Sequence, residues 1–97
     1  FIKLINWKVA AAGGANHADS SATKVFATEF YTEGYRLLME IVGPASYLER
    51  GSPGSVLAGK MQRGFQGTLI LTFGGGVNEV QRELIAQFGL DLPRVPR

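Results

Sequence analysis

The sequence predicts an all-α fold. Polar residues recur every four positions from Lys24 to Glu40, and apolar residues recur at three- and four-residue spacing from Val77 to Phe88. Both spacings are those of a helix face. A β-rich run at 68–73 would suit a strand, but nothing else in the chain offers it a sheet partner. We therefore expect helices over residues 1–12, 19–42, 56–73 and 77–88, followed by a tail at 89–97.

The composition is that of one small globular domain. Hydrophobic residues make up 45% of the chain, which is enough to form a core. A length of 97 residues is too short for a large enzyme with an enclosed cofactor site. The chain has no cysteine and a lone His17, so we expect no thiolate or zinc site. A net charge of +2 does not favour nucleic acid as a partner.

The chain shows no signal for membrane insertion or export. No apolar run reaches the roughly 18 residues of a membrane span, and no secretory signal is present. We expect a cytoplasmic protein. The chain begins without Met, as if already inside a helix, which suggests a fragment of a longer protein.

In the first helix, apolar residues from Phe1 to Val9 keep helical spacing. Gly13 and Gly14 should end this helix, as glycine does just past a helix end. The connector that follows contains His17, which has no acidic or metal-ligating neighbour nearby and is expected to be a solvated loop histidine.

The second helix should be capped by Asp19, Ser20 or Ser21 and ended by Gly43-Pro44. The polar residues at every fourth position from Lys24 to Glu40 form a polar ridge along this helix. The remaining sides of the helix carry apolar or small residues. A surface helix of a small domain would need a narrower apolar stripe. We therefore expect burial on more than one side, as in the middle of a bundle or at a subunit interface.

The third helix, at 56–73, follows a loop at 45–55. Three of its positions are glycines, Gly59, Gly64 and Gly67. Each lowers the helix propensity by up to about 1 kcal/mol. The alternative interpretation is that these glycines let neighbouring helices pack closely.

Three consecutive glycines, Gly74 to Gly76, stand directly before the last helix. Glycine accepts a positive φ and lets another molecule approach the backbone. A turn that opens a helix gathers unpaired N–H groups and the positive end of the helix dipole at one point. Such a point suits an anionic or polar ligand. The spacing matches no phosphate-binding loop, so a glycine-rich turn between two packed helices stays open as the alternative.

Three segments, in order, resemble the C-terminal region of acyl-CoA dehydrogenases. Residues 75–86, Gly-Gly-Val-Asn-Glu-Val-Gln-Arg-Glu-Leu-Ile-Ala, closely resemble the signature that opens the last helix of that family. Residues 19–43 resemble its long helix, with Thr23-Lys24 near the start. Residues 60–63 resemble the segment with a conserved arginine that precedes the last helices. The resemblance covers nearly the whole chain.

The resemblance implies part of an up-down four-helix bundle at the end of a longer, FAD-dependent enzyme. Such enzymes oxidise an acyl-CoA thioester to the 2,3-enoyl-CoA: a glutamate removes the α-proton and FAD accepts the β-hydride. It also implies a homo- or hetero-tetramer, and it implies site residues. FAD of a neighbouring subunit would contact Glu40, Ile41, Val42, Gly43 and Pro44, FAD on the chain's own side would contact Val77, Asn78 and Glu79, and the thioester would lie beside Gly76.

The chain departs from the family pattern at four positions. Gly75 occupies the usual position of the glutamate base, so no catalytic residue is assigned to this chain. Val77 replaces threonine, Glu40 replaces glutamine and Pro44 replaces glycine, which weakens three FAD contacts. In one subgroup of the family the base comes from an earlier helix, which this chain lacks. The other possibility is a subunit of a heteromeric enzyme that never carried a base.

Two alternatives remain open. In the first alternative, the chain is a catalytically silent helical partner subunit of a heteromeric acyl-CoA dehydrogenase-like complex. In the second, it belongs to a relative of the family with other flavin chemistry, such as an oxidase.

Overall fold

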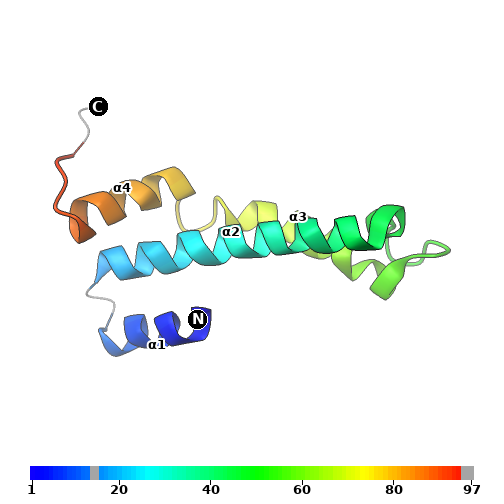
Figure 1. The fold of residues 1–97 in the computed structure, drawn as a ribbon, viewed down its shortest axis with the longest axis horizontal. Helices are drawn as coiled ribbons and strands as arrows, with labels where there is room; N and C mark the ends of the chain where they lie inside the picture. The colour runs from blue at the N-terminus through cyan, green and yellow to red at the C-terminus, as the bar shows by residue number, and fades with distance from the viewer. Residues whose placement is uncertain (14–15, 95–97) are drawn as a thin grey trace. The chain divides into compact units, whose positions relative to one another are not determined.

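The computed structural model describes residues 1–13 and 16–94, and the described residues form helices and no strand. The prediction of an all-α fold is confirmed. Figure 1 shows the elements in chain order. The elements are α1 (Ile2–Ala11), α2 (His17–Val42), the 3-10 helices η1 (Gly43–Tyr47) and η2 (Val56–Gly59), α3 (Lys60–Leu71) and α4 (Asn78–Gly89).

Two compact units divide the chain, and the long helix α2 contributes to both. The first unit comprises Phe1–Ala27 and Gly74–Arg97, and the second comprises Thr28–Phe73. The first unit therefore holds α1, the start of α2 and α4, whereas the second holds the rest of α2, both 3-10 helices and α3.

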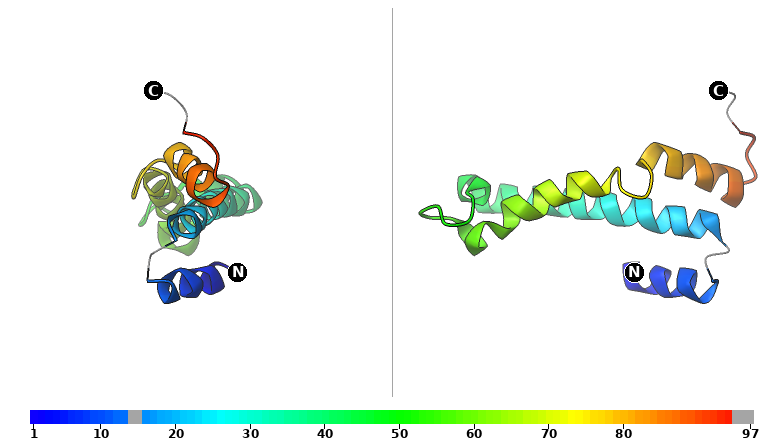
Figure 2. Two further views of the ribbon diagram at one scale, coloured as in Figure 1. Left: turned by 90° about the vertical axis from the view of Figure 1, so that its left-hand side faces the viewer. Right: turned by 180° about the vertical axis from the view of Figure 1, so that it is seen from behind.

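In the first unit, α1 and α4 lie on opposite sides of the start of α2 (Figure 2). Helix α1 contacts α2 through the rings of Phe1 and Phe26, whose centroids are 4.9 Å apart, and through an ion pair of 3.4 Å between Lys8 and Asp19. Helix α1 buries no residue of its own. The buried face of α2 in this unit is made of small and β-branched residues, namely Ala18, Ser21 and Val25.

Helix α2 begins earlier than the sequence indicated, because Asn16 is its cap. The Oδ1 atom of Asn16 accepts a hydrogen bond of 3.1 Å from the backbone N–H of Asp19, as an N-cap side chain does. The predicted caps Asp19, Ser20 and Ser21 are wrong, and all three lie inside the helix. His17 is exposed as predicted, but it starts the helix instead of lying in a loop.

The sequence predicted that Gly13 and Gly14 end α1, and the structure confirms this for Gly13. Gly13 has φ +62° and donates its N–H to the carbonyl of Ala10, the left-handed termination that glycine favours. The expectation for Gly14 lies outside the described residues.

In the second unit, α3 runs back alongside α2 (Figure 2). The ring of Tyr35 packs directly on Gly64, so that a Cβ at position 64 would overlap it. Met39 and Met61 are buried, each 5% exposed. Nothing lies within 4 Å of a Cβ built on Gly67. Close packing therefore explains Gly64 but not Gly67.

Helix α3 is shorter than the predicted range 56–73. Residues 57 to 59 have left-handed backbones, with φ values of 50°, 53° and 72°, so the right-handed helix can begin only at Lys60. Gly59 is buried against the backbone of Arg50, whose N atom would be 2.5 Å from a Cβ at position 59. This contact accounts for glycine at 59 better than helix packing does.

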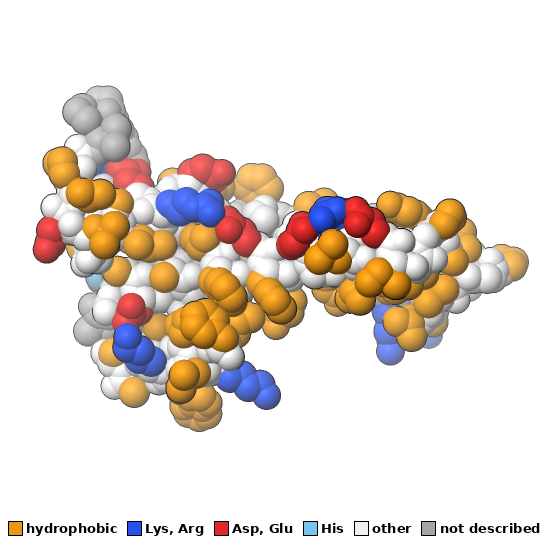
Figure 3. Space-filling view, viewed as in Figure 1, with side chains coloured by type: hydrophobic (Ala, Val, Ile, Leu, Met, Phe, Trp, Pro, Cys, Tyr) orange, Lys and Arg blue, Asp and Glu red, His pale blue; other side chains and the backbone are white. Residues whose placement is uncertain are grey.

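Large apolar side chains remain exposed on α2, as Figure 3 shows in part. The polar ridge of α2 is not uniform either, because Thr28 is only 7% exposed. Six apolar side chains of α2 are exposed: Phe26, Phe30, Tyr31, Leu37, Leu38 and Ile41.

The two glycines of α3 provide a matched test of the second unit. Gly64→Ala should destabilise the protein by about 1–3 kcal/mol, because the new methyl group displaces the Tyr35 ring. Gly67→Ala should be neutral or stabilising by up to about 1 kcal/mol, since it improves helix propensity in open space. Urea unfolding of both variants measures the difference, and equal effects would refute the packing contact.

Candidate functional site

The turn before α4 requires glycine at two positions. Gly75 has φ +75° and Gly76 has φ +103°, backbone conformations that side chains with a Cβ rarely adopt. A Cβ on Gly76 would lie 2.6 Å from Nε2 of Gln81. That Nε2 atom donates a hydrogen bond of 2.9 Å to the carbonyl of Gly75. The first turn of α4 thus holds the glycine turn from one side.

Lys24 of α2 also holds this turn. Its Nζ atom donates to the carbonyl of Gly76 at 2.7 Å and to Oδ1 of Asn78 at 2.5 Å. Asn78 is the first residue of α4 and is only 7% exposed. One ammonium group therefore joins α2 to a turn and a helix more than 50 residues further along the chain.

The start of α4 is electrostatically positive. Its N-cap, Val77, has an extended backbone and provides no side-chain cap. The first N–H groups of a helix have no intrahelical acceptor, and the helix dipole adds to the charge of Lys24. Glu79 is exposed in this first turn, where a carboxylate is favourable.

Of the predicted site residues, Gly76, Val77, Asn78 and Glu79 lie together here. The side chain of Asn78 is engaged by Lys24 and supports the turn. Sequence reasoning noted Lys24 as the first residue of the polar ridge and as part of a family pattern, and missed its contacts.

The second predicted group, Glu40 to Pro44, lies at the end of α2 in the other unit. Ile41 is 81% exposed, and Gly43 has φ +75°. The backbone at the end of α2 is stabilised by Ser46, which is 1% exposed and donates its hydroxyl to the carbonyl of Gly43 at 2.7 Å. Ser46 also reaches the carbonyl of Met39 at 3.3 Å, so it satisfies two carbonyl groups at a helix end.

The charge of Glu40 is balanced inside the chain. Arg36 forms ion pairs with both Glu33 and Glu40, at 2.5 Å for Glu33. The hydrogen bond from Arg36 lowers the pKa of Glu33, and the two carboxylates raise the pKa of Arg36. Glu40 therefore does not oppose a phosphate group as an unpaired carboxylate. This pairing, with an exposed Ile41 and a glycine at 43, fits the approach of a flavin nucleotide, although Pro44 supplies no N–H.

No carboxylate occupies the glycine turn. Glu79 and Glu83 follow inside α4, one and two turns from Gly75. In the described ranges, no three His, Asp or Glu side chains are grouped as metal ligands would be. Among the described helices, none has the length and apolar character to cross a bilayer.

Residues 1–90 match the family described as "Acyl-CoA dehydrogenase, C-terminal domain". The chain therefore belongs to this family.

Two curated relatives come from Mycobacterium tuberculosis. The chain is 51% identical over 102 residues to "Acyl-CoA dehydrogenase FadE26" and 47% identical over 100 residues to "Acyl-CoA dehydrogenase FadE29". These alignments cover 99% and 98% of the chain, and 26% and 24% of the relatives. The chain thus spans about a quarter of the length of these relatives.

Solved structures share the fold. A chain of the "ChsE4-ChsE5 complex from Mycobacterium tuberculosis" matches with a TM-score of 0.90 and 54% identity, over 98% of this chain and 25% of that one. A chain of the "Tcur3481-Tcur3483 steroid ACAD" matches with a TM-score of 0.87 and 40% identity, over 97% and 25%. The resemblance and the bundle fold inferred from the sequence are confirmed.

The buried hydroxyl of Ser46 can be tested directly. Ser46→Ala should destabilise the protein by about 1 kcal/mol, because two carbonyl groups lose their donor. Ser52→Ala is the control, since Ser52 lies in the loop of the same unit and its side chain forms no described hydrogen bond. Thermal unfolding compares the two variants, and an unchanged Tm for Ser46→Ala would contradict this role.

Proposed function

We propose that this chain is the C-terminal segment of an FAD-dependent acyl-CoA dehydrogenase that oxidises an acyl-CoA to the 2,3-enoyl-CoA. The observation that carries the proposal is the glycine turn at the start of α4, held by Lys24 in a chain of this family. A backbone turn free of side chains lets a flat cofactor and a thioester approach closely.

The segment contributes FAD contacts and oligomer packing. Val77, Asn78 and Glu79 contact the FAD bound by the chain's own subunit, and Gly76 lies beside the thioester. Residues 40 to 44 contact the FAD of a neighbouring subunit. The internal pairing of Glu40 with Arg36 supports this assignment, because it removes an unpaired negative charge from the segment.

The base that removes the α-proton lies in another part of the parent enzyme. Proton abstraction needs a base within hydrogen-bond reach of the reacting carbon, and glycine at 75 offers none. FAD, when bound, supplies the hydride acceptor. The chain's own residues then bind and orient the substrate and do not carry the proton.

The parent enzyme acts in a complex of several subunits. The exposed apolar side chains of α2 call for a covering surface, either the rest of the parent chain or a neighbouring subunit, because folded proteins rarely expose large apolar patches. The related solved structures are named as two-component assemblies, and one is named a steroid enzyme. We therefore propose that the parent enzyme is a hetero-tetramer or a homo-tetramer. Its proposed substrate is an acyl-CoA with a steroid-like acyl group.

The second candidate function is a catalytically silent subunit of such a complex. Gly75 favours it, because a chain that never carried a base at this turn needs no carboxylate there. The two candidates differ in whether FAD and substrate bind at this subunit.

The proposed function is tested in the full-length parent, assayed with acyl-CoA and an artificial electron acceptor. Glu79→Gln and Glu83→Gln should each retain exchange of the substrate α-proton, because both side chains lie beyond the turn. Loss of α-proton exchange in Glu79→Gln, with FAD still bound, would place the base inside this segment. Turnover by the wild-type complex with no FAD bound at this subunit would leave the silent subunit as the better description.

The charge balance at the end of α2 predicts a pattern of FAD affinities. Arg36→Gln should weaken FAD binding, because Glu40 is then unpaired and its carboxylate repels the phosphate groups of FAD. The double variant Arg36→Gln/Glu40→Gln should restore the affinity, and Glu40→Gln alone should leave it nearly unchanged. Flavin fluorescence titration measures all three. A loss in Arg36→Gln that the second substitution does not restore would contradict this account.

A further inference from the structure

We propose that Lys24 and Gln81 are positioning residues that orient two successive peptide groups of the glycine turn toward the ligand. This inference rests on the proposed function and adds to it the side chains that fix the ligand-facing backbone.

The two side chains bind neighbouring carbonyl groups. Gln81 donates to the carbonyl of Gly75 at 2.9 Å, and Lys24 donates to the carbonyl of Gly76 at 2.7 Å. Both glycines have positive φ. Without Cβ atoms, these residues have a wide choice of backbone conformations, so the two side chains select one of them.

Holding a carbonyl also fixes the N–H of the same peptide group. In a trans peptide the C=O and N–H bonds point in opposite directions across a rigid plane, and residues 1–13 and 16–94 contain no cis peptide bond. The Gly75 carbonyl is fixed toward Gln81, so the N–H of Gly76 points away from Gln81. For the same reason the N–H of Val77 points away from Lys24.

These two N–H groups are not used by the described part of the chain. No described hydrogen bond has the N–H of Gly76 or Val77 as donor. Gly76 is exposed and Val77 is half-buried. Both N–H groups are therefore left for acceptors on a ligand, such as the carbonyl oxygens of the thioester and of the flavin ring.

Lys24 is suited to this task by its surroundings. It projects from the interior of α2, a helix of 26 residues, and its second acceptor, Asn78, is nearly buried. A rigid helix and a buried partner restrict the ammonium group to a small volume. Preorganisation of this kind is what keeps a binding group in its productive geometry.

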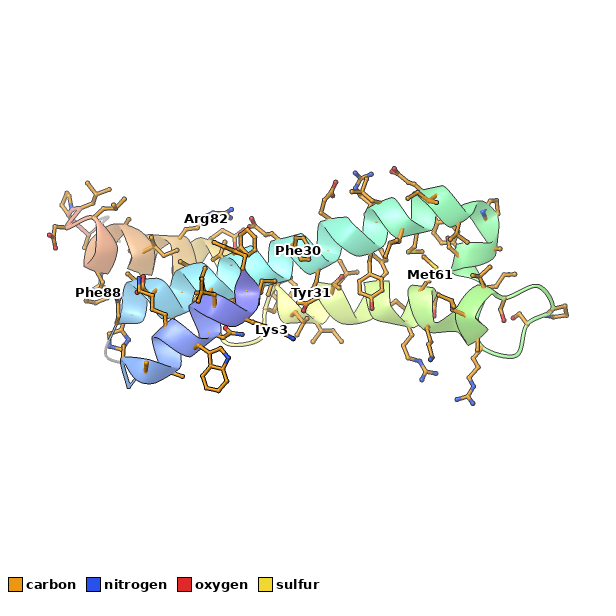
Figure 4. All side chains as sticks on the ribbon, turned by 60° about the horizontal axis from the view of Figure 1, so that its bottom comes forward. Lys3, Phe30, Tyr31, Met61, Arg82 and Phe88 are labelled. Atoms are coloured by element: carbon orange, nitrogen blue, oxygen red, sulfur yellow. The ribbon has the colours of Figure 1, made fainter. Side chains whose placement is uncertain are left out.

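The test uses the full-length complex. Lys24→Met keeps the aliphatic stem and removes the donor, and Gln81→Met does the same at the other carbonyl. Lys3→Met is the matched control, because Lys3 lies exposed on α1 of the same unit (Figure 4). Measurements are kcat and KM for acyl-CoA, the visible flavin spectrum, FAD affinity, and Tm.

Lys24→Met should lower kcat/KM at least tenfold and change the flavin spectrum, and Lys24→Arg should recover part of the loss. Lys3→Met should match the wild type. An increase in KM with unchanged FAD affinity identifies the thioester oxygen as the acceptor, and a fall in FAD affinity identifies the flavin oxygen.

Unchanged kinetics and an unchanged spectrum in folded Lys24→Met would overturn the inference. If Lys24→Met does not fold, Gln81→Met decides by the same criteria. If the wild-type complex shows no turnover, the proposed function fails, and the flavin spectrum and FAD affinity of the variants still decide on Lys24.

Discussion

The ammonium group of Lys24 joins α2 to the glycine turn and to the start of α4 within the first unit. It bonds a backbone carbonyl at Gly76 and the nearly buried amide oxygen of Asn78. Hydrogen bonds to charged groups contribute about 1.5–3 kcal/mol each. Removal of the Lys24 ammonium group would take this donor away from the amide oxygen of Asn78, a residue that is nearly buried. The glycine turn and the start of α4 therefore depend on one side chain of α2.

The same constraint explains why a site can exist without catalytic groups of its own. Glycines at 75 and 76 remove side chains from the ligand-facing surface, and the resulting freedom of the backbone is then restricted by Lys24 and Gln81. At the end of α2, Ser46 and Arg36 similarly complete a helix end with an exposed residue, Ile41. In the proposed function, each unit contributes an ordered backbone segment, and the chemistry is left to FAD and to the rest of the parent enzyme.

The sequence predicted the helices well and their ends less well. Helical spacing located α2 and α4 within two residues at each end, because periodic burial is a signal that many residues share. The left-handed residues Leu57 and Ala58 could not be predicted, since side chains with a Cβ rarely adopt this conformation. The contacts of Lys24 and Ser46 were also beyond prediction, because each depends on which carbonyl groups the fold brings within reach. The cap at Asn16 was readable in principle, since asparagine is a preferred N-cap.

A double-mutant cycle on Lys24 and Asn78 tests the central claim most directly. The unfolding free energies of the full-length protein would be measured for Lys24→Met, Asn78→Leu and the double variant. Residues in direct contact show coupling energies of about 0.5–3 kcal/mol, whereas independent sites add to within about 0.5 kcal/mol. The account predicts a coupling of at least about 1 kcal/mol, because either substitution alone breaks the same hydrogen bond. Additive effects would show that Lys24 does not hold the start of α4, and would contradict the account.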